Sequence, residues 1–278
     1  MSDATGKTVL VTGATDGLGR HVATELAAKG ATVLVHGRNQ ERLEAILEDV
    51  REQEYEGEAR SYQADLSSLA AVRELAERIL TEEGRLDVLV NNAGIASGKR
   101  RVSEDGVELT FAVNYLSHFL LAELLMPLLR NSAPARIVNV ASAGQSPINF
   151  SDPMLEREYD TMRAYSQSKL AQIMFTFDLA ERESNTGVTA NALHPASLMD
   201  TKMVRESFGY TMSTVEEGAE AVVRLVVSPE VEGVTGAYFD GTSEARANRQ
   251  AYDPQARERL WTLSEQLCGP LLEPVASR

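Results

Sequence analysis

Cysteine is almost absent from this chain, since Cys268 is the only one in 278 residues. One thiol excludes an intrachain disulfide and a zinc site built from several cysteines, and it is compatible with a reducing compartment. The few histidines are scattered without the spacing of metal ligands, so we expect no bound metal. They are His21, His36, His118 and His194.

Positive charge and long apolar runs are also scarce. The 27 basic residues against 41 acidic ones give a net charge of −14, which argues against a surface that follows nucleic-acid phosphates. Residues 1–7 contain no apolar signal region, and the most apolar stretch, 119–129, is interrupted by Glu123 and Pro127 and is too short to span a bilayer. We expect a soluble, cytoplasmic protein with no nucleic-acid partner and no membrane span.

Strand-like and helix-like patterns alternate along the whole chain, and no linker, low-complexity segment or internal repeat divides it. This alternation predicts a single α/β domain over residues 1–278, with a doubly wound (Rossmann) sheet of about seven parallel strands flanked by helices. The predicted strands are 8–12, 32–36, 60–64, 86–91, 136–141, 188–193 and 237–239. The predicted helices are 18–29, 39–53, 69–82, 103–130, 160–183, 214–227 and, in a C-terminal tail 254–278, 254–267.

Two local signals refine this arrangement. Ser213 and Glu216 have the spacing of a capping box that opens helix 214–227. The carboxyl ends of the strands should meet at one edge of the sheet, where ligands collect in open α/β folds.

A glycine-rich turn follows the first predicted strand. Gly13, Gly17 and Gly19 have the spacing G-x-x-x-G-x-G between an apolar strand and a helix. Glycines permit a tight turn and close backbone approach, and a helix N-terminus attracts a pyrophosphate. The alternative is a plain turn between strand and helix, which the position directly after a β-branched strand disfavours.

Tyr165 and Lys169 lie four positions apart, so a helix would place the phenol and the ammonium on one face. A nearby cation favours the phenolate, and we therefore expect Lys169 to lower the pKa of Tyr165 from about 10. Such a tyrosine can transfer a proton to a carbonyl oxygen. The alternative is an ordinary surface pair, because the spacing is common on helices.

Five motifs together resemble the short-chain dehydrogenase/reductase family in order and approximate spacing, from residue 7 to about residue 240. They are Thr12-Gly13-x-x-x-Gly17-x-Gly19, Asn91-Asn92-Ala93-Gly94, Asn114, Ser142 and Tyr165-x-x-x-Lys169. The runs 36–39 and 165–171 and the tail Trp261-x-x-Ser264-Glu265 are similar to the retinol dehydrogenase-like, NADP-dependent branch of that family.

The resemblance implies hydride transfer between a nicotinamide and a carbonyl or alcohol carbon, with a catalytic set of four residues. Tyr165 would be the general acid or base, and Ser142 would hydrogen-bond the substrate oxygen, although alone it reads as a turn residue. Lys169 would also bind the nicotinamide ribose. Asn114 would continue a water-mediated proton relay from that lysine.

Cofactor choice is indicated at the end of the second predicted strand. Arg38 supplies a guanidinium where NAD-selective sites usually have a carboxylate, and it would favour the 2′-phosphate of NADP (NADPH) unless it is only a solvated loop residue. The predicted cofactor-binding residues are Gly13, Thr15, Asp16, Gly17, Leu18, Gly19, Arg38, Asn39, Asp65, Leu66, Asn92, Ala93, Gly94, Tyr165, Lys169, Pro195, Ala196 and Ser197.

The sequence does not show where the two acidic side chains in this set, Asp16 and Asp65, point. Asp16 could point away from the phosphates or cap the following helix. Asp65 could meet the adenine ring, as the resemblance implies, or cap the next helix.

The chain departs from the family pattern in two places. The gap of 23 positions between Ser142 and Tyr165 predicts an extra loop at 143–164 that could border the substrate. After the sixth predicted strand, Ala196 stands where the family usually has glycine, and Thr201 falls one place late. Both departures bear on the substrate side of the site.

A substrate lid is expected at about 195–213, because long loops often close active sites. Its apolar residues favour a medium or bulky apolar ketone, aldehyde or secondary alcohol as the small-molecule substrate, although such residues are often ordinary core packing. They are Met199, Met203, Phe208, Tyr210 and Met212.

Three functions remain open at this point. The catalytic set favours an NADP-dependent carbonyl reductase or alcohol dehydrogenase. The same scaffold could act as a biosynthetic epimerase or dehydratase, or as a non-catalytic NADP-binding sensor. The resemblance also implies assembly into a homodimer or homotetramer.

Overall fold

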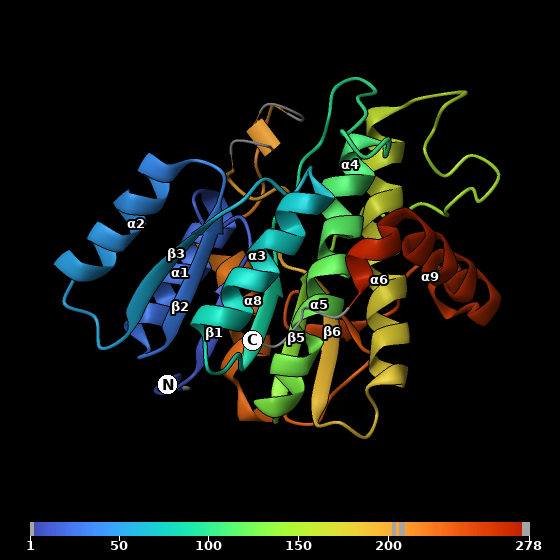
Figure 1. The fold of residues 1–278 in the computed structure, drawn as a ribbon. Helices are drawn as coiled ribbons and strands as arrows, with labels where there is room; N and C mark the ends of the chain where they lie inside the picture. Colours follow the sequence, from blue (N-terminus) through green and yellow to red (C-terminus); the bar gives the residue numbers. More distant parts are fainter. Residues whose placement is uncertain (1–2, 202–203, 206–208, 274–278) are drawn as a thin grey trace.

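Eight strands form one sheet in this computed structural model, which describes residues 3–201, 204–205 and 209–273. The strand order is β3-β2-β1-β4-β5-β6-β7-β8, and the pairs from β3 to β7 are parallel (Figure 1). This confirms the predicted doubly wound fold with seven parallel strands. The bounds are β1 Thr8–Val11, β2 Thr32–Gly37, β3 Glu58–Gln63, β4 Val88–Asn91, β5 Ala135–Val140, β6 Val188–His194, β7 Tyr238–Asp240 and β8 Ser243–Ala245.

The eighth strand is an addition to the prediction. β8 pairs antiparallel with β7 through a two-residue hairpin, in which Gly241 has a φ of +57°. Tight hairpins of this kind need positive φ at a central residue, which glycine adopts without strain. The three residues of β8 carry no apolar alternation of their own, so only the pairing with β7 makes them a strand.

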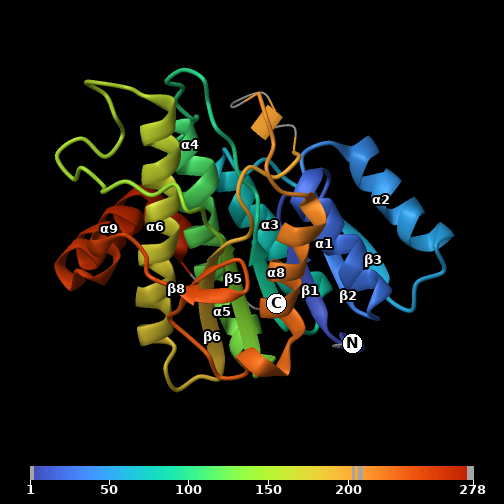
Figure 2. The ribbon, with the colours of Figure 1, turned by 180° about the vertical axis from the view of Figure 1, so that it is seen from behind.

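Helices cover both faces of the sheet (Figures 1 and 2). One face packs against α3, α5 and α6, and the other against α1, α2 and α8. The bounds are α1 Gly17–Ala28, α2 Gln40–Glu52, α3 Leu69–Glu82, α4 Leu109–Phe111, α5 Ser117–Asn131, α6 Thr161–Arg182, α8 Val215–Val227 and α9 Pro254–Cys268. Short helical turns are η1 Ala112–Leu116, η2 Pro229–Val231, η3 Arg249–Tyr252 and η4 Gly269–Leu272.

Side-chain alternation along the strands explains the two apolar cores. In β1, Leu10 joins the core beneath α3 and α5, whereas Val9 and Val11 join the core beneath α1 and α8. β4 repeats the pattern with Leu89 on the first face. Successive side chains of a strand point to opposite faces, so these continuous apolar runs need helices on both sides.

The predicted helix 103–130 begins later than expected. Residues before Leu109 form a turn, in which Ser103 N donates to Val107 O, and Glu108 caps the helix by accepting from Thr110 N and Phe111 N at 3.0 and 2.8 Å. A carboxylate that satisfies the first free N–H groups fixes the start of a helix. The helix then passes through the π-helical turn η1 into α5.

The stretch Leu109–Asn131 is long and apolar enough to cross a membrane by length and composition, and 89% of its most apolar window is buried inside the protein. The core helix of a soluble protein meets the same criteria.

The capping box of α8 lies one residue later than predicted. Thr214 Oγ1 accepts from Glu217 N, and Glu217 Oε2 accepts from Thr214 N, both at 3.2 Å. Ser213 instead accepts at its backbone oxygen from Asp200 N, which closes the base of the loop that precedes α8.

The C-terminal helix α9 packs across α5 and α6. Trp261 lies 5.0 Å from Phe119 and 5.9 Å from Phe175 between ring centroids, and Tyr115 shares a 2.6 Å hydrogen bond with Ser264. Aromatic packing with a satisfied hydroxyl fixes the helix in place. The predicted helix in the C-terminal tail is present as α9, and the short turn η4 continues it to Leu272.

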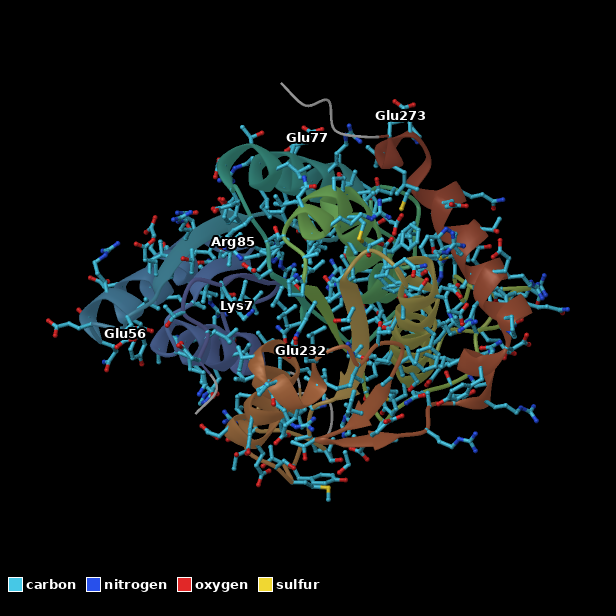
Figure 3. All side chains as sticks on the ribbon, turned by 90° about the horizontal axis from the view of Figure 1, so that it is seen from below. Lys7, Glu56, Glu77, Arg85, Glu232 and Glu273 are labelled. Atoms are coloured by element: carbon cyan, nitrogen blue, oxygen red, sulfur yellow. The ribbon has the colours of Figure 1, made fainter. Side chains whose placement is uncertain are left out.

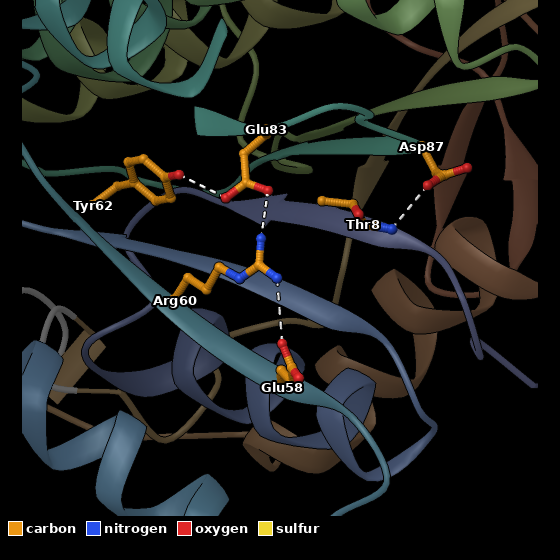
Figure 4. Close-up of polar contacts among 6 residues, drawn as sticks. All are labelled: Thr8, Glu58, Arg60, Tyr62, Glu83 and Asp87. Atoms are coloured by element: carbon orange, nitrogen blue, oxygen red, sulfur yellow. Dashed lines mark hydrogen bonds and ion pairs between the residues drawn. The ribbon is translucent and has the colours of Figure 1, made fainter. Parts of the chain in front are cut away.

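Charged side chains lie at the edge of the sheet opposite the motifs (Figure 3), and Figure 4 shows polar contacts that they make with strand residues. The buried Glu83 carboxylate accepts from Tyr62 Oη at 2.7 Å and from Arg60 Nη1 at 2.8 Å, which raises the pKa of Arg60. Asp87 accepts from Thr8 N at 2.8 Å. A buried carboxylate needs such partners, and this edge is accordingly built for stability.

Candidate active site

A cavity of about 760 Å³ opens at the carboxyl ends of the strands. It is lined by 18 of the predicted site residues: Gly13, Thr15, Asp16, Gly17, Leu18, Gly19, Arg38, Asp65, Leu66, Asn92, Ala93, Gly94, Ser142, Tyr165, Lys169, Pro195, Ala196 and Ser197. Asn39 and Asn114 are not among the lining residues. Motifs that are distant in sequence therefore meet at one edge, as parallel strands require.

The glycine turn is packed too closely for side chains. A Cβ on Gly19 would lie 2.3 Å from Gly13 O and 2.4 Å from Asn92 Nδ2, and Gly13 itself has a φ of +66°. Asn92 Nδ2 in turn donates to Thr12 O at 2.8 Å. The turn is thus a bare backbone surface ahead of the N-terminus of α1, which is suited to an anion.

His36 supports this turn from below. Its Nδ1 accepts from Gly13 N at 3.2 Å, and its Nε2 lies 3.2 Å from Ala64 O. Burial lowers the pKa of His36 to about 4, so the ring is neutral and its Nε2 carries the proton. Sequence reasoning placed the end of the second strand at the site through Arg38 but did not assign His36, because nothing in the sequence indicates that this side chain accepts from Gly13 N.

Asp16 caps α1, which settles its direction. Its Oδ1 accepts from Gly17 N at 2.8 Å, and its Oδ2 lies 3.2 Å from Arg42 Nη1. Arg42, in the first turn of α2, also lines the cavity and was missed by the sequence analysis. Its position four residues after Arg38, at the start of a helix, is the signal that could have indicated it.

Two guanidinium groups therefore stand beside the end of β2. Arg38 lies 3.9 Å from Asp65, and both side chains are exposed at the cavity wall. Asn39 accepts from Arg42 N at 2.8 Å and so serves as the N-cap of α2. β2 ends at Gly37 without an acidic residue, and the local donor set fits a phosphate.

Tyr165 projects from α6 into the cavity beside Ser142, which follows β5. Burial raises the pKa of the Tyr165 phenol, and a hydrogen bond with Ser142 acts in the opposite direction. The backbone oxygen of Ser142 accepts from Tyr238 Oη at 3.1 Å and from Gln145 Nε2 at 3.0 Å. Tyr238 on β7 and Gln145 in the same loop thus hold the backbone of the serine that faces the phenol.

Lys169 lies one helical turn from Tyr165, with Nζ 5.7 Å from the ring centroid. The ammonium donates to Val140 O at 2.7 Å and to Gln172 Oε1 at 2.8 Å, and burial lowers its pKa to about 7. The expected net lowering of the Tyr165 pKa is wrong for this arrangement, because burial of the phenol outweighs the attraction of an ammonium that lies over the ring. The charge is directed at two oxygen acceptors instead of the phenol oxygen, and burial then decides the shift.

Asn114 lies in the π-helical turn η1, behind the cavity wall. Its Oδ1 accepts from Ile95 N at 2.8 Å, and its Nδ2 donates to Ile95 O at 3.0 Å and to Ser168 Oγ at 3.0 Å. The amide therefore ties the loop after β4 to the helix that carries Tyr165. π-Helical turns occur frequently at functional sites, where they re-aim a side chain.

Apolar residues also line the cavity. They include Ile95, Ala96, Ala143, Gly144, Met162, Leu198, Met199 and Val204, of which Met199 lies beside Gly218 of α8. Thr201 lies beside the glycine turn, where its Cγ2 would be 3.3 Å from a Cβ on Gly17. The threonine that falls one place late in sequence therefore still lies at the site.

The expected lid contributes only in part. Residues 195–199, 201 and 204 line the cavity, whereas Tyr210 and Met212 are 59% and 69% exposed and do not. Met203 and Phe208 lie outside the described residues. Of the extra loop 143–164, Ala143 and Gly144 line the cavity, as does Met162, which already lies in the first turn of α6. Hydrogen bonds of Gln250 in η3 to the backbone of Ile148 hold the loop.

No group of three or more His, Cys, Asp or Glu side chains is placed to hold a metal ion within residues 3–201, 204–205 and 209–273. The donor set fits a nicotinamide dinucleotide instead. Bare glycine backbone and a helix N-terminus are available for the pyrophosphate, and Lys169 and Tyr165 lie at the far end of the same cavity.

Comparison with known proteins agrees with this geometry. The profile of a family described as short chain dehydrogenase matches residues 7–209. Mouse retinol dehydrogenase 13 is 39% identical over 95% of this chain and 84% of its own length. Human retinol dehydrogenase 14 is 40% identical over 96% of this chain and 87% of its own length.

Solved structures extend the similarity. An uncharacterised protein from Mycobacterium paratuberculosis superposes with a TM-score of 0.80 at 30% identity, covering 96% of this chain and 95% of its own. A short chain dehydrogenase from Shigella flexneri complexed with NADP gives a TM-score of 0.72 at 25% identity, covering 87% and 99%.

Proposed function

Because the chain belongs to the short-chain dehydrogenase family and is an oxidoreductase, we propose that it is an NADP-dependent enzyme that interconverts a carbonyl and a secondary or primary alcohol on a medium or bulky apolar substrate. The observation that carries the proposal is the placement of Tyr165, Ser142 and Lys169 in one cavity with two guanidinium groups at its other end.

Selection of NADP over NAD is supported by Arg38 and Arg42. Both line the cavity beside the end of β2, and no carboxylate is present in the run 36–39 to accept bonds from a ribose hydroxyl. A planar guanidinium binds phosphate with charge-assisted hydrogen bonds. The NADP in the Shigella flexneri relative is consistent with this preference.

An apolar substrate is supported by the apolar side chains of the cavity. Ile95, Met162 and Met199 are among the residues that line it, and retinol, in the names of the similar mouse and human proteins, is a bulky apolar alcohol. Apolar walls with a few convergent polar groups are typical of ligand pockets. Retinaldehyde is therefore a suitable probe for carbonyl reduction.

Three residues of the chain have separate roles in proton transfer and substrate binding. When bound, the nicotinamide supplies or accepts the hydride at the carbonyl carbon. In the reducing direction Tyr165 donates its phenolic proton to the substrate oxygen, and the Ser142 hydroxyl holds that oxygen by a hydrogen bond. The ammonium of Lys169, close to the ring, stabilises the phenolate left behind, which regains its proton from solvent.

The test follows NADPH consumption by the purified protein on small aliphatic, aromatic and polycyclic carbonyls and on retinaldehyde. NADH and the variant Tyr165→Phe are measured in parallel. We expect turnover that prefers NADPH, favours apolar carbonyls and falls by at least about a thousandfold in Tyr165→Phe, with cofactor binding retained. Tight NADPH binding without turnover on any carbonyl would favour a sensor, and turnover retained in Tyr165→Phe would refute the mechanism.

Location and assembly remain predictions. The protein is proposed to act in the cytoplasm as a homodimer or homotetramer. Cell fractionation and analytical ultracentrifugation would test these two points.

A further inference from the structure

Behind Lys169, a buried amide and a buried imidazole continue the hydrogen-bond chain away from the cavity. Gln172 Oε1 accepts from Lys169 Nζ at 2.8 Å, and Gln172 Nε2 lies 3.0 Å from His118 Nδ1. Lys169, Gln172 and His118 are 4%, 1% and 0% exposed. Gln172 is on α6 and His118 on α5, the two helices that lie side by side in Figures 1 and 2.

The direction of each hydrogen bond follows from the ammonium. Because an ammonium only donates, the amide oxygen of Gln172 must face Lys169, and its NH₂ must face His118. His118 Nδ1 is then the acceptor, and the ring proton is on Nε2, 3.5 Å from Thr12 Oγ1. Burial and then the charge of Lys169 lower the pKa of His118 to about 3, so the ring stays neutral.

Thr12 connects the far end of this chain to the cavity wall. Its Oγ1 accepts from Asn92 N at 2.9 Å and from Ala93 N at 3.0 Å, and both residues line the cavity. The hydroxyl also donates to Val90 O at 3.3 Å, so its hydrogen-bonding capacity is filled, and the 3.5 Å approach of His118 Nε2 is a packing contact with the residue that supports the loop after β4. Neither Gln172 nor His118 is among the cavity-lining residues.

We propose that Gln172 and His118 are positioning residues for Lys169. The Gln172 oxygen holds Nζ beneath Tyr165 and favours its charged form, and His118 determines which end of the Gln172 amide faces the lysine. Without the His118 acceptor, the amide can rotate and turn its NH₂ toward the ammonium, which repels it. This inference rests on the proposed function, because its effect is expressed through Tyr165 and Lys169.

Few other charged groups face the lysine. The titratable side chains around Nζ are Tyr165 on its own helix and His118 on α5, and the ion pairs found among the described residues include none to Lys169. Gln172 and Val140 O are the acceptors that its ammonium has. Substitution of Gln172 therefore changes the environment of the charge directly.

The first experiment compares Gln172→Leu with Gln172→Glu in NADPH-dependent carbonyl reduction. Reduction should be lost as pH rises and Lys169 deprotonates. In Gln172→Leu the ammonium loses an acceptor, so we expect this loss at a pH about one unit lower, with kcat reduced about tenfold and the carbonyl KM little changed. In Gln172→Glu a carboxylate favours the ammonium, and the loss should move to higher pH.

The second experiment exploits the geometry of the imidazole. In His118→Asn the introduced amide oxygen can replace Nδ1 as the acceptor, so this variant should retain most of the wild-type kcat and pH profile, whereas His118→Leu should behave like Gln172→Leu. Thr176→Val is the matched control, because Thr176 is equally buried on α6, accepts from Asn139, and contacts only the backbone oxygen of Gln172, not its amide side chain or Lys169. It should lower Tm without moving the pH profile.

The outcomes separate this inference from the proposed function. No turnover by the wild-type protein on any carbonyl would refute the proposed function itself. Wild-type turnover with the same pH profile in folded Gln172→Leu, or with both Gln172 variants shifted in one direction, would overturn the positioning role. If Gln172→Leu does not fold, as judged by circular dichroism, the direction of the shift in Gln172→Glu decides the matter.

Discussion

Arg42 and Asp16 form an ion pair across the mouth of the glycine turn, with Nη1 3.2 Å from Oδ2. The carboxylate is needed there because its other oxygen caps α1 through Gly17 N. A bare negative charge at this position would oppose the favourable field that a helix N-terminus offers a phosphate. Arg42 offsets that charge, and the capping residue is thus compatible with an anion site.

The pair can be tested by a double-mutant cycle. Arg42→Ala should weaken NADPH binding about tenfold, because it removes a phosphate donor and leaves Asp16 uncompensated. Asp16→Asn keeps the capping oxygen and removes the charge, so Asp16→Asn combined with Arg42→Ala should bind about threefold more tightly than Arg42→Ala alone. Fluorescence titration with NADPH measures all four proteins. Additive effects of the two substitutions would contradict this coupling.

Arg38 should determine the choice between the two nicotinamide cofactors. Arg38→Ala removes the guanidinium at the end of β2, and we expect KM for NADPH to rise about tenfold or more while KM for NADH changes little. The ratio of kcat/KM for the two cofactors measures the effect. Arg51→Ala, at the exposed far end of α2, is the control and should leave the ratio unchanged.

Sequence was sufficient for the features that strand order determines. Ser142 and Asn92 follow parallel strands, and Tyr165 and Lys169 have helical spacing, so their meeting at one edge follows from the α/β pattern. Strand and helix alternation depends on local periodicity, which the chain displays clearly. The fold and most of the cavity lining could therefore be predicted.

Features that depend on tertiary contacts could not be predicted from the sequence. The helix beginning at Leu109 depends on the buried cap by Glu108, and the partners of Lys169 come from β5 and from its own helix only once α6 is packed. The direction of Asp16 required Arg42 from another helix. The contacts of Lys169 with Val140 and of Asp16 with Arg42 join residues far apart in the chain, so they leave no spacing signal.

Gly19 should be indispensable for steric reasons. A methyl group there would meet Gly13 O at 2.3 Å and Asn92 Nδ2 at 2.4 Å, neither of which can yield without disrupting the turn. We expect Gly19→Ala to abolish detectable NADPH binding and lower Tm. Gly84→Ala is the matched control, because a Cβ at Gly84 meets nothing within 4 Å. Calorimetric titration with NADPH distinguishes them, and normal binding by Gly19→Ala would show that the turn can adjust.

Glu123 on α5 is a carboxyl group in an unfavourable position beside α6 and α9. Burial and then the neighbouring Glu183 raise its pKa to about 7, and Arg182 and Arg130 only partly oppose this. Because the unfolded chain would ionise near 4.3, the folded state holds a proton that the unfolded state releases between these values. The contribution of Glu123 to stability is therefore present below about pH 4 and is lost as pH rises to about 7.

Replacing the Glu123 carboxyl group with a neutral amide should remove the loss of stability that accompanies the rise in pH. We expect Glu123→Gln to raise Tm by a few degrees at pH 8, equivalent to about 1–2 kcal/mol after allowance for its residual exposure, and to change it much less at pH 5. Thermal unfolding followed by circular dichroism at both pH values measures the difference. Glu48→Gln, at an exposed position on α2, is the control for the Glu-to-Gln substitution itself. An equal Tm change in Glu123→Gln at pH 5 and pH 8 would mean that packing, not ionisation, determines the effect.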